Sequence, residues 1–152
     1  MQRANGLMIK AHRETLKGHN PLLMHYQMLR SDIKFLPETS PVQAQIQAAV
    51  KGTHAPTHDS FRLEVEAVFR VEREGEAYSF APFAALPERR LLWHGSRMTN
   101  AVGILSQGLR VAPPEAPKTG YMFGKGLYFA DCASKSANYC HATREQPYGL
   151  LV

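Results

Sequence analysis

Three short segments of this sequence carry residue types that could bind a ligand and act on it. The first is His94-Gly95-Ser96, the second is residues 124–131 with Tyr128, and the third is residues 134–139 with Tyr139. Imidazole and hydroxyl groups exchange hydrogen bonds with ligands, and a flat aromatic ring can lie against a planar one. Each segment also has an ordinary structural explanation, such as relief of crowding by glycine or a half-buried tyrosine on a helix. Taken singly, each segment favours the structural explanation.

A metal site is not predicted from the histidines and cysteines. His54 and His58 stand four residues apart, but Pro56 between them prevents the regular helix that would align them. The chain has two cysteines, Cys132 and Cys140, and they form no C-x-x-C pair. Two cysteines are too few for a disulfide framework, so reduced thiols in a cytosolic or nuclear protein are the simplest interpretation.

The composition is that of one globular domain. The 152 residues are 44% hydrophobic and 20% charged, which is enough apolar material for a core. Lysine and arginine number 18 against 13 acidic residues, giving a net charge of +5. This balance favours phosphate-bearing partners, although it is also common on ordinary solvated surfaces. No apolar run is long enough for a membrane span, and no secretory signal follows Met1, so no membrane partner is expected.

The elements that must position these segments are short helices and strands. The clearest signal is residues 61–72, where every second position is apolar and five of the six alternate positions are charged. Ser40 and Pro41 begin one helix, and Gly52 follows its end. Further helices are expected at 22–29, from 99 or 100 to 107, and from 131 or 134 to 139, and further strands at 32–36, 127–130 and 149–152.

The order of these elements indicates the fold class. Helices and strands do not alternate regularly, as they would in a doubly wound fold. The sequence contains no G-x-G-x-x-G after a strand and no Walker loop, so the common nucleotide-binding folds are not supported. An α+β class is predicted.

Taken together and in this order, the three segments closely resemble the catalytic domain of the poly(ADP-ribose) polymerases. The resemblance covers residues 20–152 and is strongest from Arg89 onward, where it includes residues 89–93, 106–117 and 119–126. It is closest to the DNA-damage-responsive branch, in which the long proline-bearing loop at 106–117 is typical. The resemblance implies an ADP-ribosyltransferase fold of split, mostly antiparallel sheets with short helices, and NAD+ bound in a cleft between them.

The same resemblance implies a domain division. Residues 20–152 would be the N-terminal part of the catalytic domain, incomplete at the C-terminus. Residues 1–19 would be a linker or a remnant of the helical regulatory subdomain. DNA would be bound only through modules missing from this chain, and the protein would be nuclear and part of the DNA damage response.

The resemblance assigns roles to individual residues by position. The backbone of Gly95 and the hydroxyl of Ser96 would hold the nicotinamide carboxamide, and glycine suits a close approach of the ligand to the main chain. Tyr128 and Tyr139 would sandwich the nicotinamide ring. The implied NAD-binding residues are His94, Gly95, Ser96, Gly103, Arg110, Tyr121, Tyr128, Phe129, Ala130, Ser136 and Tyr139. The implied catalytic residues are His94, Tyr128 and Lys135.

The remaining implied roles assign residues to different parts of the NAD+ cleft. His94 would bind the adenosine ribose, and Ser136 would be a further nicotinamide contact. Gly103 would border the pocket, and Lys135 would lie on the cleft wall. Arg110 and the loop to Tyr121 would line the adenosine side, with the guanidinium placed for polar or phosphate contacts.

The implied reaction transfers ADP-ribose from NAD+ to protein acceptors or to a growing ADP-ribose chain, and releases nicotinamide. NAD+ is a substrate here, and no metal is expected. An oxocarbenium-like transition state requires a nearby carboxylate. The glutamate that supplies it in the family lies on a later strand and has no matching position in this chain.

Two functions of other classes stay open on the sequence. One is a truncated, catalytically inactive NAD-binding or interfering module that lacks the catalytic glutamate. Saturable ligand binding without turnover would support it. The other is a basic α+β interaction domain, which unchanged ligand binding after Tyr139→Ala or Ser96→Ala would favour.

Overall fold

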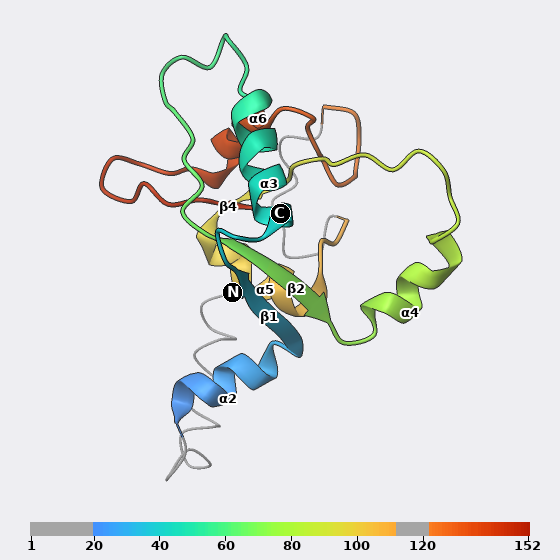
Figure 1. Cartoon of the computed structure of the whole chain (residues 1–152). Coiled ribbons are helices and arrows are strands. Elements are labelled where there is room, and N and C mark those ends of the chain that lie inside the picture. Colours follow the sequence, from blue (N-terminus) through green and yellow to red (C-terminus); the bar gives the residue numbers. More distant parts are fainter. Residues whose placement is uncertain (1–19, 112–121) are drawn as a thin grey trace.

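The computed structural model describes residues 20–111 and 122–152, which form two small antiparallel sheets with short helices around them (Figure 1). In the first sheet, β1 (Ser31–Leu36) pairs with β2 (Val68–Arg73) over their whole length. In the second, β3 (Gly95–Ser96) pairs with β4 (Leu150–Leu151). The predicted α+β class with split antiparallel sheets is confirmed. The expected linker at 1–19 and the NAD-binding candidate Tyr121 lie outside the described residues.

Five described helices and three single 3-10 turns connect these strands. They are α2 (Pro21–Met28), α3 (Pro41–Gly52), α4 (Glu76–Phe80), α5 (Ala101–Gln107), α6 (Ala133–Ala137), η1 (Ala81–Phe83), η2 (Met98–Asn100) and η3 (Asn138–Cys140). The predicted helices near 22–29, 41–51 and 100–107 are confirmed, and Gly108 ends α5 with a positive φ of 74°. That conformation suits glycine at a helix C-terminus. The segment α4–η1 has no helical periodicity and was not predicted.

The core lies where α3, β3 and α6 meet. Val50 of α3, Trp93 before β3 and Ala133 of α6 are buried against one another. Half-buried apolar residues surround them, namely Ile46, Ala49, Leu63, Val65 and Leu151. Because Trp93 and Ala133 belong to this cluster, the core holds the His-Gly-Ser tripeptide beside α6.

The prediction of one strand over 61–72 is wrong for its first half. β2 begins only at Val68, and residues 61–67 have no partner strand in the described part of the chain. The burial pattern still alternates, because the odd-numbered positions from 61 to 67 are half-buried and the positions between them are exposed. Leu63 and Val65 use this inward face to pack on the core. The alternation at 61–67 therefore predicted correctly which face is buried. Formation of a strand would also have required a hydrogen-bonded neighbouring strand.

The predicted buried strand at 127–130 is also wrong. Within residues 20–111 and 122–152, only Ala130 of this run pairs with another segment, through an isolated bridge to Trp93, and Phe129 is 46% exposed. An apolar run does not form a strand where a single bridge is its only ladder contact. The following helix is shorter than predicted, because α6 begins at Ala133 and turns into η3 at Asn138.

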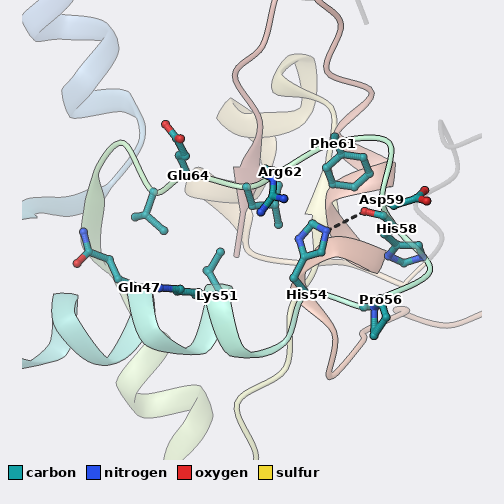
Figure 2. Close-up of a pocket in the computed structure, with 13 residues that line it drawn as sticks. Gln47, Lys51, His54, Pro56, His58, Asp59, Phe61, Arg62 and Glu64 are labelled. Carbon is teal, nitrogen blue, oxygen red and sulfur yellow. Dashed lines mark hydrogen bonds between the residues drawn. The ribbon is translucent and has the colours of Figure 1, made fainter.

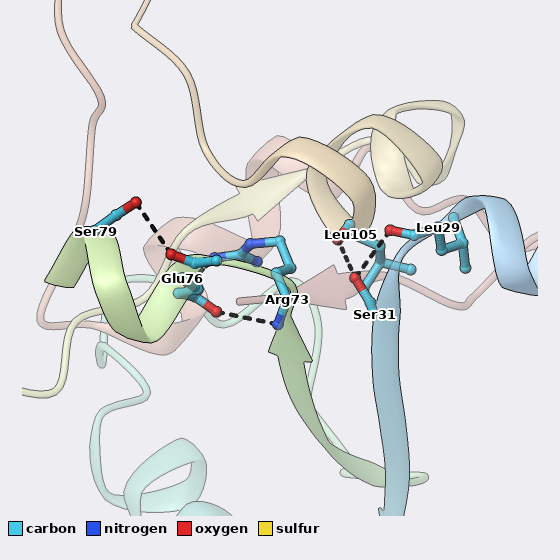
Figure 3. A network of polar contacts seen from close by, with 7 residues as sticks. Leu29, Ser31, Arg73, Glu76, Ser79 and Leu105 are labelled. Carbon is cyan, nitrogen blue, oxygen red and sulfur yellow. Dashed lines mark hydrogen bonds and ion pairs between the residues drawn. The ribbon is translucent and has the colours of Figure 1, made fainter.

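Polar contacts attach the β1–β2 sheet to α5 and α4 (Figure 3). The hydroxyl of Ser31 lies 2.7 Å from the carbonyl oxygen of Leu105 in α5 and 3.1 Å from that of Leu29. Its one proton can be donated to only one of them, and the nearer carbonyl of Leu105 is the better acceptor. At the same end of the sheet, where Arg73 pairs with Ser31, Arg73 of β2 forms an ion pair with Glu76 of α4. The Ser31 contact holds α5 on the sheet, next to the residues that follow β3, and the ion pair joins α4 to β2.

Candidate functional site

The segment 93–96, which ends in β3, pairs with β4 and Val152 on one side and with Ala130 on the other. The main chain of His94 exchanges two hydrogen bonds with Val152, with N–O distances of 2.8 and 2.9 Å. Trp93 exchanges two with Ala130, at 2.7 and 3.0 Å. Because bonded and non-bonded pairs alternate in an antiparallel ladder, the N–H and C=O of Gly95 point away from β4. They face the same side as the Ala130 bridge and can offer one donor and one acceptor to a ligand.

Gly95 lies so close to α6 that it has no room for a side chain. A Cβ atom at this position would be 1.8 Å from the carbonyl oxygen of Ser136 and 2.6 Å from its carbonyl carbon. Ser136 is itself buried, and its hydroxyl donates to the carbonyl oxygen of Trp93 at 2.8 Å. The first and third segments predicted from the sequence therefore meet, and close packing of two backbones requires the glycine.

The hydroxyl of Ser96 is buried and oriented by a neighbour. The side-chain amide of Asn100, in η2, donates to Ser96 Oγ at 3.0 Å. Since an amide nitrogen only donates, the hydroxyl keeps its own proton for another acceptor. The sequence predicts Asn100 only as a candidate helix cap, but its side chain makes no cap hydrogen bond in α5. The signal that would have found it is its position four residues after Ser96.

His94 joins the first segment to the second. Its Nδ1 lies 2.9 Å from the carbonyl oxygen of Tyr128, and its ring is tilted against Phe129 with centroids 5.7 Å apart. Because a carbonyl can only accept, Nδ1 carries a proton, which makes Nε2 the acceptor nitrogen of the neutral ring. The imidazole is thus held in one tautomer, with Nε2 suited to accept a hydrogen bond from a ligand hydroxyl.

The two tyrosines expected to sandwich a ring differ in their surroundings. The Tyr128 hydroxyl donates to the carbonyl oxygen of Gly124 at 2.7 Å and accepts from the Phe123 N–H at 3.1 Å. These bonds attach the ring to its own loop. Tyr139 lies in η3 and is 61% exposed, so its side chain has room to pack on a ligand. Their placement on two sides of one ring stays a prediction.

The structure does not gather all the predicted site residues. Gly103 on α5 and Lys135 on α6 are exposed, as is Arg110, whose guanidinium donates to the Gln107 side chain at 2.7 Å. Among the described residues, no hydrogen bond or ion pair joins these three to the His-Gly-Ser tripeptide. The group that is brought together comprises His94, Gly95, Ser96, Tyr128, Phe129, Ala130 and Ser136.

A separate cavity lies between α3 and the extended segment at 61–65 (Figure 2). Its volume is about 790 Å³, and none of the predicted site residues that the structure describes lines it. His54 and His58 are on its wall, where His54 Nε2 donates to the His58 carbonyl at 2.8 Å. Within the described ranges, no three metal-binding side chains are grouped together. No helix in those ranges has both the length and the apolarity of a membrane span.

Comparison with known proteins places this chain in a family. Residues 43–152 match the family model described as "Poly(ADP-ribose) polymerase catalytic domain". The chain is 53% identical over 154 residues to "Poly [ADP-ribose] polymerase 1" of Gallus gallus, covering 97% of this chain and 15% of that protein. It is 55% identical to the Danio rerio protein of the same name and 54% identical to "Poly [ADP-ribose] polymerase" of Drosophila melanogaster, each over 133 residues. Both matches cover 88% of this chain and 13% of the relative, so the chain spans a small part of these proteins.

Proposed function

The chain belongs to the poly(ADP-ribose) polymerase family, and we propose that residues 20–152 form the N-terminal part of its catalytic domain and bind the nicotinamide end of NAD+. The family model covers residues 43–152, and the Gallus gallus match extends over nearly the whole chain. Both support a domain that includes β2 and the His-Gly-Ser tripeptide, and the Gallus gallus match extends it to β1.

The observation that carries this proposal is the orientation of the Gly95 main chain. A carboxamide has one carbonyl acceptor and one NH2 donor side by side. The N–H and C=O of Gly95, turned away from β4, are complementary to that pair. The free proton of the Ser96 hydroxyl and the lone pairs of Ser136 Oγ supply further partners of the right kind. A carboxamide ligand would thus satisfy polar groups that β3 and α6 bring together.

The proposed reaction follows from holding the leaving group. The bond between the ribose C1′ and the pyridinium nitrogen of NAD+ breaks, and its electron pair neutralises the ring of the departing nicotinamide. An acceptor oxygen of a protein or of an ADP-ribose chain then bonds to C1′ and gives up its proton. Fixing the carboxamide orients the scissile bond, and this positioning contributes to the rate of the reaction. His94 Nε2 would accept a hydrogen bond from a ribose hydroxyl, and Lys135 would line the cleft.

The proposal extends to the cellular role of the whole protein. The matching relatives are named as poly(ADP-ribose) polymerases, which supports protein acceptors and ADP-ribose chains as the partners of the reaction. A nuclear location and a role in the DNA damage response rest on the likeness of residues 106–117 to the DNA-damage-responsive branch.

Calorimetric titration with nicotinamide and with nicotinic acid tests the proposal. Nicotinic acid has the same ring, but its carboxylate cannot donate to the Gly95 carbonyl. We expect saturable binding of nicotinamide. The acid should bind at least about tenfold more weakly, because the Gly95 carbonyl would lose its hydrogen-bond donor. Equal affinities for both ligands, or no binding by a folded chain, would contradict the proposal. Release of nicotinamide from NAD+ reports turnover, and binding without turnover would support the inactive module instead.

A further inference from the structure

A second cluster of reactive side chains lies at the start of α6, outside the nicotinamide site. Ser134 is fully buried, with 0% relative exposure. Its Oγ lies 2.9 Å from the Ala55 nitrogen, 2.8 Å from His58 Nδ1 and 3.2 Å from Cys132 Sγ. One hydroxyl therefore connects a thiol on one side to an imidazole on the other. His58 comes from the loop after α3, where it borders the cavity (Figure 2).

Because Ser134 has a single hydroxyl proton, the protonation of Cys132 and that of His58 depend on each other. A hydroxyl has one proton and two lone pairs, and the Ala55 N–H occupies one lone pair. One proton and one lone pair remain for His58 and Cys132. If His58 Nδ1 accepts the hydroxyl proton, Cys132 must donate its own proton to Ser134. If Nδ1 carries a proton, the hydroxyl points to Cys132 and stabilises a thiolate.

The surroundings of the sulfur favour that second arrangement. Burial opposes ionisation of Cys132, but the Ser134 hydroxyl and three backbone N–H groups that face the sulfur outweigh it, and the pKa of the thiol is lowered. The side chain is half-buried, so reagents can reach it. Cys140 is the opposite case: it is buried, its Sγ donates to the Leu150 carbonyl at 3.3 Å, and burial raises its pKa.

We propose that Cys132, Ser134 and His58 form a nucleophile–relay–base cluster, in which Cys132 is a site of covalent modification by α,β-unsaturated carbonyl compounds. The sulfur attacks the β-carbon and forms a C–S bond, while the π electrons of the alkene move to an enolate. The thiolate forms when Nδ1 starts as the acceptor: Ser134 passes its hydroxyl proton to Nδ1 and takes the thiol proton. A proton returned from His58 through solvent then quenches the enolate at its α-carbon. The addition has no leaving group and needs no oxidant. It is independent of NAD+ binding.

The cluster occupies a defined place relative to the nicotinamide site. Cys132 is the N-cap residue of α6, and Ser136, whose backbone contacts Gly95, lies one helical turn later. An adduct on Cys132 would therefore stand at the end of the helix that forms one wall of the proposed carboxamide site.

The test uses acrylamide, the simplest amide of this class, and the two cysteines of the purified chain as mutual references. Peptide mass spectrometry follows alkylation of Cys132 and Cys140 with time at neutral pH. We expect Cys132 to react at least about tenfold faster than Cys140 in the native chain, because thiolates are the nucleophiles, and the two rates to converge in denaturant. Equal rates in the native chain would overturn the proposal.

Two substitutions test the relay, with a matched control. Ser134→Ala and His58→Phe should each slow alkylation of Cys132 about tenfold, as expected for losing a hydrogen bond to a charged group. His54→Phe is the control, since both histidine rings contact Phe61 but only His58 touches Ser134. Slow alkylation of Cys140 verifies that each variant is folded. If Cys132 reacts at the wild-type rate in folded His58→Phe, the relay is wrong.

Discussion

A methyl group on Gly95 would lie 1.8 Å from the carbonyl oxygen of Ser136, so β3 and α6 are in contact through their backbones. Neither atom belongs to a flexible side chain that could move aside. The same short stretch of β3 turns the N–H and C=O of Gly95 toward the proposed ligand. Packing of α6 and presentation of the main chain therefore depend on one residue.

Substitution of Gly95 by alanine should damage both properties. The Cβ forces β3 and α6 apart, and we expect a loss of about 1–3 kcal/mol in the free energy of unfolding, typical of overpacking. Nicotinamide binding in the same variant should fall below detection by calorimetry. Gly103→Ala is the control for stability, because an added Cβ on α5 meets nothing within 4 Å. Wild-type ligand affinity in Gly95→Ala would show that β3 does not form the site.

Tyr139 should contribute to ligand binding without contributing to stability. Its side chain is 61% exposed, so Tyr139→Ala should change the free energy of unfolding by less than about 0.5 kcal/mol. Loss of a stacking partner should weaken nicotinamide binding by roughly fivefold to tenfold, and Tyr139→Phe should retain it. Tyr148→Ala is the matched control, since Tyr148 is 67% exposed and outside the predicted site. Equal effects of the two alanine variants on calorimetric affinity would remove Tyr139 from the site.

The local signals of the sequence predicted most of the elements. Pro41 and Gly108 mark a helix start and a helix end by their own backbone preferences, and both lie where expected. Such constraints act within a few residues, so they can be read without knowing the fold. The alternation at 61–67 identified the buried face for the same reason.

Features that depend on contacts between residues far apart in the sequence could not be predicted from such local signals. Whether residues 61–67 form a strand depends on a neighbouring strand, which the described part of the chain does not provide. The contact of Gly95 with Ser136 joins positions 41 residues apart, as numbered in the sequence, and no local pattern encodes it. The family resemblance predicted Gly95 as a ligand contact, whereas the structure adds that packing against α6 also requires a glycine.

Asn100 should act on ligand binding through Ser96. Its amide donates to Ser96 Oγ and leaves the hydroxyl proton for the ligand. In Asn100→Asp, a carboxylate would accept that proton, so nicotinamide affinity should fall by about tenfold, comparable to one hydrogen bond to a charged group. Asn100→Ala removes only the hydrogen bond that orients the Ser96 hydroxyl, so it should lower nicotinamide affinity less than Asn100→Asp does. Calorimetric titration of both variants gives the order, and a weaker effect of aspartate than of alanine would contradict this role.

Cys140 should make stability depend on pH in the alkaline range. Burial raises the pKa of its thiol in the folded chain, whereas the unfolded chain ionises it near about 8.5. Between the two values the folded state binds more protons than the unfolded state, so the free energy of unfolding falls as pH rises. Urea unfolding from about pH 7 to about pH 10 should show the stability advantage of wild type over Cys140→Ser shrinking above about pH 8.5. Cys132 is present in both proteins, so its contribution cancels in the comparison. If the difference in the free energy of unfolding between the two proteins stayed constant with pH, folding would not raise the pKa of the Cys140 thiol.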